Sequence, residues 1–246
     1  MVAQSRKEMI LQFLRDNRHF VTVDELCENL YVSGATVRRD LAELENNRMI
    51  RRVRGGAILM EGSTSDAPVD FREGQSVMQK QVIAGMALGH IQDGMTLFMD
   101  ASSTVFTLAR KLDGFVNLRV ITNGLKAALQ LSEYKGVSVM CTGGTLRENS
   151  KSLVGQAALD YIANYNADVA FMSCRGFSVE NGASEASEQE FHIKRQFMQN
   201  SKKSVLMVDS SKHDIDYLCR IAPLSRFDDV ISERKELNEL CKAARG

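Results

Sequence analysis

The sequence predicts an α/β protein built from two unequal parts, and three observations predict it. Arginines concentrate between residues 34 and 54, beside helical patterns. Residues 61–70 (EGSTSDAPVD) are small and polar, which is typical of an exposed linker. From residue 71 the chain repeats one order: an apolar run of strand length, a cluster of small polar residues, then a helical pattern. Because domains commonly hold roughly 100–200 residues, a chain of 246 residues accommodates two such parts.

The composition excludes several classes of protein. With 44% hydrophobic and 25% charged residues and a net charge of zero, the chain is typical of globular proteins. No stretch approaches the roughly 20 apolar residues of a membrane span. The N-terminus lacks the apolar core of a secretory signal, so we expect a cytoplasmic protein without membrane contact. Scattered cysteines without a CxxC pair and distant histidines argue against disulfides and metal sites, and we expect no cofactor.

The first part reads as three short helices. Apolar residues at helical spacing predict the first helix over residues 5–17. Thr22 followed by Glu25 has the spacing of a capping box and predicts a second helix that ends at the segment YVSG. Ser33 then stands where an N-cap opens a third helix that continues to about Asn46.

The third helix presents a small and cationic outer face, opposite its apolar stripe. Such a face fits the major groove of DNA, because bulk would block entry while guanidinium groups reach phosphates or guanine edges. Beyond this helix, MIRRVRGGAILM predicts two short strands that form a basic wing. The alternative is a three-helix scaffold with solvated arginines. The residues that we expect to contact DNA are Ser33, Ala35, Thr36, Arg38, Arg39, Arg51, Arg52 and Arg54.

The motifs of this part have a family-specific spacing. The run VDELCENLYVSGATVRRDLAELE, followed by IRRVRGGA, closely resembles the N-terminal winged helix-turn-helix of DeoR-family transcriptional regulators. With the linker that composition places over residues 61–70, the resemblance implies a DNA-binding domain over residues 1–60 and an effector-binding sensor domain over residues 71–246.

The second part predicts an open, mostly parallel α/β sheet. Its strand-length runs are continuously apolar, not alternating, which indicates strands that helices cover on both faces. Helical patterns lie over residues 71–91, from Val105 to Leu112, over 156–164 and over 188–201. The strand segments with their polar ends are 95–104, 118–124, 137–145, 168–176 and 204–212.

Small hydrogen-bonding residues follow each predicted strand. In a parallel sheet these residues converge at one edge, where such folds bind ligands. Glycine backbones and cationic side chains favour an anion there, and Asp100, Asn123 and Asp209 can accept from hydroxyl groups. We therefore expect a phosphorylated sugar or similar anion. The candidate effector-binding residues are Asp100, Ser102, Ser103, Thr104, Asn123, Gly143, Gly144, Arg175, Glu188, Asp209 and Lys212.

This second part resembles the DeoR-family sensor domain, which is itself similar to ribose-5-phosphate isomerase. The matching segments are DASST, ITNG, CTGGT, GASEASEQEFHIKRQ and VDSSKHD. By motif position, the resemblance implies that Glu188 and Lys212 belong to the effector site. Glu190 and Lys194 lie four residues apart, so the alternative is that part of this helix is only a solvated ion-pair face. Arg175 departs from the family pattern: it either clamps a second anionic group or pairs with a nearby carboxylate.

These expectations define a ligand-responsive transcriptional regulator, a repressor of carbohydrate metabolism genes that binds operator DNA as a homo-oligomer. Binding of the effector would alter operator affinity. Two alternatives remain open at this stage. One is an isomerase-like enzyme that carries a DNA-binding domain, and the other is an architectural DNA-binding protein without a ligand.

Overall fold

The computed structural model describes residues 3–16, 20–47, 49–59 and 68–243. The chain divides after Gln75 into two compact units. Residues 61–67 of the expected linker lie outside the described residues, and Val69 already begins a helix, α4 (Val69–Glu73). No helix among the described residues is long and apolar enough to cross a membrane.

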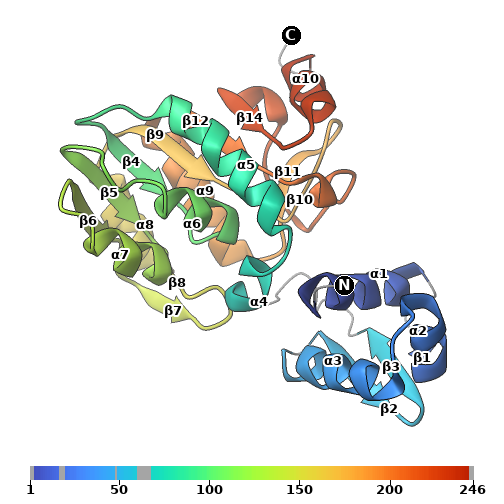
Figure 1. The fold of residues 1–246 in the computed structure, drawn as a ribbon. Coiled ribbons are helices and arrows are strands. Elements are labelled where there is room, and N and C mark those ends of the chain that lie inside the picture. The colour runs from blue at the N-terminus through green and yellow to red at the C-terminus, as the bar shows by residue number, and fades with distance from the viewer. Residues whose placement is uncertain (1–2, 17–19, 48, 60–67, 244–246) are drawn as a thin grey trace. The chain divides into compact units, whose positions relative to one another are not determined.

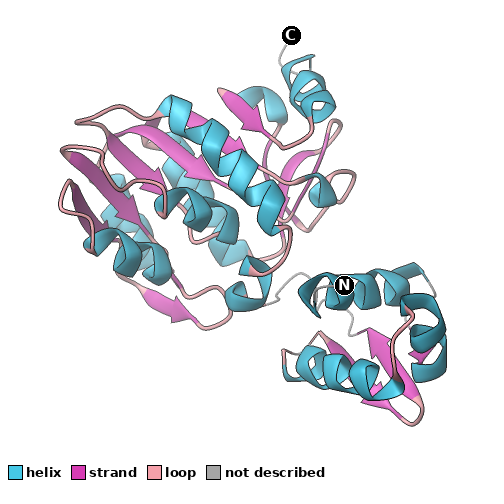
Figure 2. Cartoon of the chain, viewed as in Figure 1, coloured by secondary structure: helices cyan, strands magenta, loops and turns pink. Residues whose placement is uncertain are grey.

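The N-terminal unit is a winged helix-turn-helix (Figures 1 and 2). The capping box of the second helix is confirmed: Glu25 N donates to Thr22 Oγ1 at 3.2 Å, and Thr22 N donates to Glu25 Oε2 at 2.8 Å. A three-residue strand, β1, was not expected from the sequence; it pairs antiparallel with β3 at the base of the wing. The elements are α1 (Ala3–Asp16), β1 (Phe20–Thr22), α2 (Val23–Leu30), α3 (Gly34–Asn46), β2 (Ile50–Val53) and β3 (Gly56–Leu59).

One buried ion pair fixes α3 against α1. Asp40 is 1% exposed and accepts a hydrogen bond at 3.0 Å from the Nη2 of Arg6. Around this pair, Val37, Leu41 and Leu44 of α3 are buried in the core of the unit. Because the inner side of α3 is held by both packing and a paired charge, its outer side has a fixed orientation.

The second unit contains a six-stranded sheet whose order is β14-β12-β9-β4-β5-β6. Every neighbouring pair in it is parallel, so all strands end at the same edge. The five strands that the sequence predicts are confirmed, and the short edge strand β14 is an addition. The strands are β4 (Thr96–Met99), β5 (Leu118–Thr122), β6 (Val137–Cys141), β9 (Ala167–Met172), β12 (Ser201–Met207) and β14 (Asp229–Ile231).

Helices cover both faces of this sheet (Figure 1). One face packs against α5 (Val77–Ala87), α6 (Ser103–Ala109) and α7 (Leu125–Ser132). The other face packs against α8 (Gln156–Ala163) and α9 (Glu188–Gln199).

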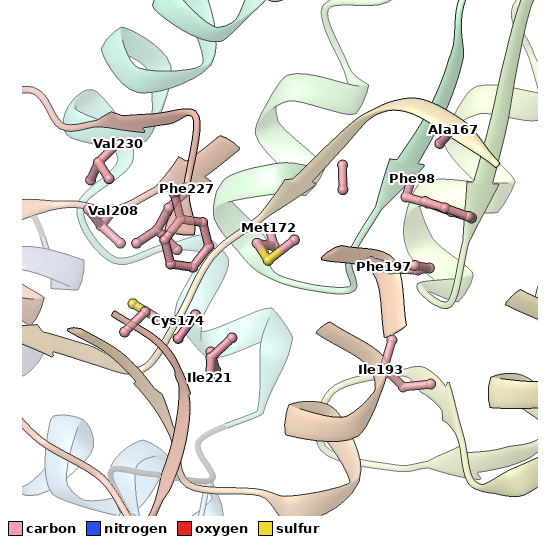
Figure 3. Close-up of a cluster of buried hydrophobic side chains, with 14 of the residues drawn as sticks. Phe98, Ala167, Met172, Cys174, Ile193, Phe197, Val208, Ile221, Phe227 and Val230 are labelled. Carbon is pink, nitrogen blue, oxygen red and sulfur yellow. The ribbon is translucent and has the colours of Figure 1, made fainter. Parts of the chain in front are cut away.

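Side chains alternate between these two layers along each strand. Figure 3 shows the core on the second face, where Phe98 of β4 and Phe197 of α9 stack with ring centroids 4.7 Å apart. Met172 at the end of β9 lies in the same core. The continuous apolar character of the central strands β4 and β9 therefore has its expected cause, since both of their faces are buried, whereas the edge strand β6 is only partly buried.

The helical pattern that the sequence predicts over residues 71–91 is interrupted. Gly74 ends α4, and Ser76, with φ +49°, adopts the left-handed region immediately before α5. Short antiparallel strands, one further helix and 3-10 turns complete the described part of the unit. They are β7 (Thr145–Arg147), β8 (Ser152–Val154), β10 (Gly176–Ser178), β11 (Gly182–Glu185), β13 (Cys219–Ala222), α10 (Lys235–Ala243) and the 3-10 turns η1 (Leu88–His90), η2 (Ser210–Lys212) and η3 (Leu224–Arg226).

Candidate functional site: a DNA-contact face and an anion site at the strand ends

The outer face of α3 carries the arginines that the sequence predicts. Ser33 is the N-cap, and its Oγ accepts from Thr36 N at 3.3 Å. Ala35, Arg38 and Arg39 are exposed, whereas the apolar stripe of the helix is buried. The outer face of α3 therefore exposes a small residue and two guanidinium groups, and guanidinium groups are among those that can bind base edges in a major groove.

The arginines of the N-terminal unit are not equivalent. Arg52 on the wing is held by Glu45: its Nε lies 2.7 Å from Glu45 Oε2, and its backbone N–H donates to Glu45 Oε1 at 2.9 Å. The backbone and side-chain hydrogen bonds of Arg52 lower the pKa of Glu45. Within the described part of the chain, Arg39, Arg51 and Arg54 form no salt bridge.

At the sensor sheet, the predicted site residues other than Glu188 follow strands whose carboxyl ends share one edge. The loop after β4 and the loop after β5 touch closely, because a Cβ on Gly124 would lie 2.9 Å from Ala101 Cα. The strand order reverses direction at β4, which is the place where open parallel sheets bind ligands. The parallel sheet thus meets the condition on which the predicted site depends.

Asp100 is the central residue of this edge. It is fully buried, and its oxygens accept from Ser102 N at 2.9 Å and from Ser173 N at 3.0 Å. Lys194 Nζ lies 3.0 Å from Asp100 Oδ2. Burial alone would raise the pKa of Asp100, but the Lys194 charge and these hydrogen bonds lower it. Asp100 therefore accepts from protein donors and fixes the ends of β4 and β9 relative to each other.

Lys194 belongs to a buried network that the sequence did not reveal. Its Nζ also lies 3.1 Å from Glu185 Oε2, and Arg175 Nε lies 3.4 Å from Glu185 Oε1. Burial would lower the pKa of Lys194, but Asp100 and Glu185 raise it above its ordinary value. The carboxylate partner that the sequence left open for Arg175 therefore exists, and it is Glu185.

The α9 face that the sequence offered as a solvated ion-pair surface is buried. Glu190 and Lys194 are 6% and 4% exposed, and Ser152 Oγ donates a short hydrogen bond to Glu190 Oε1. The opposite holds for Glu188, a predicted effector contact. Its side chain is 77% exposed and lies 3.7 Å from His192 Nε2. Since Ser187 is the N-cap, Glu188 faces solvent in the first turn while Glu190 points inward.

Lys212 is more exposed than Arg175 and Lys194, with a side-chain exposed fraction of 20% against 14% and 5%. Its Nζ donates to Ser173 Oγ at 2.8 Å and lies 3.6 Å from Asp209 Oδ2. Asp209 is turned inward, where Ser211 N donates to its Oδ1 at 3.3 Å. Burial would raise the pKa of Asp209, but Lys212, Ser211 and the nearby Lys80 lower it. The Lys212 ammonium group thus has one neutral and one charged partner.

Two buried side-chain oxygens after β4 and β5 have no hydrogen-bond partner among the described residues. They are the Oγ1 of Thr104 and the Oδ1 of Asn123. The Nδ2 of Asn123 donates to Leu153 O at 3.3 Å, so the amide is tied to the β7–β8 hairpin. Ser103 is buried beside Thr104 at the start of α6.

The loop after β6 contains Gly143 and Gly144, whose φ angles are +68° and +104°. A Cβ on Gly144 would lie 2.5 Å from Val154 O, whereas a Cβ on Gly143 would meet nothing within 4 Å. Gly144 therefore allows the loop to pack directly on the end of β8. At Gly143 a glycine is favoured only because the backbone there has a positive φ angle.

We expect Gly144→Ala to destabilise the sensor unit by about 2–4 kcal/mol, because left-handed strain and a backbone clash add together. Gly143→Ala is the matched control and should cost only about 1–2 kcal/mol, from strain alone. Urea denaturation followed by circular dichroism measures both. Equal losses in the two variants would contradict the packing role of Gly144.

Comparison with known proteins decides the family. Residues 75–234 match the DeoR C terminal sensor domain, and residues 6–62 match the DeoR-like helix-turn-helix domain. The chain belongs to the DeoR family of transcriptional regulators. This DeoR-family chain is therefore a DNA-binding transcriptional regulator with a ligand-sensing domain, as the sequence predicts.

Relatives of this DeoR-family chain are similar over nearly their whole length. The HTH-type transcriptional regulator GolR of Listeria innocua is 34% identical over 94% of this chain and 90% of that protein. The glycerol-3-phosphate regulon repressor of Escherichia coli K12 is 31% identical over 87% of this chain and 84% of that protein. Both relatives bear the names of regulators, not of enzymes.

Among solved structures, the translation initiation factor eIF-2B of Pyrococcus horikoshii OT3 shares the fold. Its TM-score is 0.50 at 14% identity, covering 94% of this chain and 88% of that one. The ribose 5-phosphate isomerase A of Methanocaldococcus jannaschii matches with a TM-score of 0.40 at 18% identity, over 55% of this chain and 53% of that one.

Proposed function

We propose that this protein is a cytoplasmic homo-oligomeric repressor of carbohydrate metabolism genes whose operator affinity depends on a phosphorylated sugar. The observation that carries this proposal is the placement of Lys212, Arg175 and the Gly143–Gly144 loop after strands that end at one edge of a parallel sheet. A regulon named for glycerol 3-phosphate in one relative agrees with a phosphorylated effector.

In this proposal the phosphate group is bound by Lys212, which is the less buried cation of the edge, and by backbone N–H groups of the glycine loop. The hydroxyl groups of the sugar are recognised by the polar side chains around them. The proposed effector residues are Asp100, Ser102, Ser103, Thr104, Asn123, Gly143, Gly144, Arg175, Asp209 and Lys212. Of these, Asp100 positions its neighbours through its hydrogen bonds. We place the exposed Glu188 at the outer rim of the effector site.

The proposed DNA contacts divide between the recognition helix and the wing. Ser33, Ala35, Thr36, Arg38 and Arg39 enter the major groove, where side chains read base edges. The wing arginines Arg51, Arg52 and Arg54 bind phosphates, which supply affinity without sequence preference.

The buried carboxylates do not favour a catalytic role. Asp100 and Glu185 are engaged with Lys194 and Arg175, while a general base needs access to a substrate proton. We therefore propose that the strand-end site binds its ligand without converting it. Phosphorylated sugars incubated with the protein and followed by NMR should remain unchanged.

The effector itself can be isolated. We expect mass spectrometry of small molecules released from the natively purified protein to find a sugar or polyol monophosphate. Lys212→Met should release none, whereas Lys203→Met, at the opposite end of β12, should match the wild type. Recovery of an unphosphorylated or nucleotide ligand would contradict the proposal.

A further inference from the structure

The helix α5 is apolar on both of its sides. Its inner side packs on the sheet through Ile83, Ala84 and Ala87. A surface helix normally carries polar residues on the opposite side. The outer side of α5 instead exposes Met78, Val82 and Met86, with exposed fractions of 75%, 48% and 46%. Such an exposed apolar patch marks a binding surface more often than chance.

The outer side of α5 has the shape of a ridge beside a groove. Met78, Val82 and Met86 are spaced by four residues and form the ridge. Beside them, a Cβ on Gly85, or on Gly89 in the following turn, would meet nothing within 4 Å. The absent side chains leave a shallow groove next to the ridge. Ridges of residues four apart that pack into equivalent grooves give the commonest class of helix crossing, at about −50°.

The outer side of α5 carries no charged residue of this helix. Lys80 is the charged residue of α5 and is buried on the inner side, while Gln81 is exposed and Gln79 is partly exposed, and both are neutral. A surface that meets its own copy across a two-fold axis brings identical residues together, so like charges there would repel. An uncharged ridge beside positions that lack side chains fits a second copy of the same helix better than a partner chosen by charge.

We propose that the outer side of α5 is the surface through which two copies of this chain associate, with Val82 next to the two-fold axis. Val82 is the middle residue of the ridge, so the ridge of each copy lies in the groove of the other (Figure 1 locates α5). This inference rests on the proposed homo-oligomer and assigns its surface. A two-fold dimer presents two recognition helices to operator half-sites about 34 Å apart.

The test introduces a charged side chain at Val82, next to the proposed two-fold axis, in the full-length protein. Val82→Glu and Val82→Lys each place like charges opposite each other, so each variant alone should associate at least about a hundredfold more weakly. Analytical ultracentrifugation should show particles of half the wild-type mass. An equimolar mixture of the two variants should recover the wild-type mass, because opposite charges then meet at the axis.

The control places the same charges elsewhere. Leu129 of α7 is 71% exposed, and Leu129→Glu or Leu129→Lys should leave the mass unchanged. If the wild-type protein sediments as a monomer, both the proposed homo-oligomer and the proposed surface are wrong. If the wild-type protein is multimeric and both Val82 variants keep its mass, the proposed surface alone is wrong. The same holds if the variants dissociate but their mixture does not recover the wild-type mass. Circular dichroism confirms that each variant is folded.

Discussion

Lys194→Met is expected to destabilise the sensor unit by about 3–5 kcal/mol, because it leaves buried carboxylates without their cation. Lys194 lies 3.0 Å from Asp100 and 3.1 Å from Glu185, and both acids are buried. Glu185 keeps Arg175, so the larger part of the loss arises at Asp100. Guanidinium denaturation followed by circular dichroism measures the free energy of unfolding.

The matched control is Lys202→Met. Lys202 also pairs with a carboxylate, Asp168, at 2.8 Å, but its side chain is 77% exposed. Exposed pairs contribute about 0–1 kcal/mol, so this variant should unfold near the wild type. Similar losses in the two lysine variants would show that burial of the Lys194 network does not govern its strength.

The Lys194 network also predicts how stability depends on pH. The pKa values of Asp100 and Glu185 are lowered, so both acids stabilise the fold above their ordinary pKa values, and this contribution is lost as the pH falls through the lowered values. In Lys194→Met, Glu185 keeps Arg175 but Asp100 loses its cation, and the burial of Asp100 then favours its protonated form. The deficit of the variant should therefore be largest at neutral pH and shrink toward pH about 4.

Arg39→Ala is expected to weaken operator binding by about 1–3 kcal/mol if Arg39 reads a base, and to relax the preference at that base pair. Arg39 is exposed on α3. A uniform loss over all sequences would instead assign it to a phosphate. Fluorescence anisotropy with duplexes selected from a random pool by the wild-type protein measures both affinity and preference.

The loss of operator affinity in Arg39→Ala can be compared with the losses in two further arginine variants. Arg52→Ala should lose less affinity than Arg39→Ala, because Arg52 already pairs with Glu45 at 2.7 Å. Arg226→Ala removes an exposed arginine of the sensor unit and should leave operator affinity unchanged. An Arg226 loss equal to that of Arg39 would indicate a general effect of charge and would contradict the role of the recognition helix.

The fold was predictable wherever local pattern decides structure. The run at Val205–Met207 is apolar because both faces of its strand are covered, and such runs identify buried strands without knowledge of their neighbours. Strand β11 shows the limit. Its residues, Gly182–Glu185, are small or acidic, a composition that is typical of a loop. The segment is nevertheless buried, because it pairs with β10 on one side and with β13 on the other.

The charged interior of the site was not predictable for a related reason. Lys194 lies four residues from Glu190, and that spacing alone favours a solvated pair. Its actual partner Asp100 is distant in sequence, and only the crossing of α9 behind β4 brings them together. The family resemblance assigns Glu188 to the effector site by its motif position. In the structure the N-cap at Ser187 sets the helix phase, so the side chain of Glu188 is exposed and that of Glu190 is buried.

The most direct test of the whole account is the operator affinity of the full-length protein with and without a panel of sugar and polyol monophosphates. At least one compound should change wild-type affinity some 5–150-fold, equivalent to a coupling of about 1–3 kcal/mol. Lys212→Met should bind the operator like the wild type but lose that response, whereas Lys203→Met should keep it. Wild-type affinity that no compound changes, or a full response in Lys212→Met, would contradict the account.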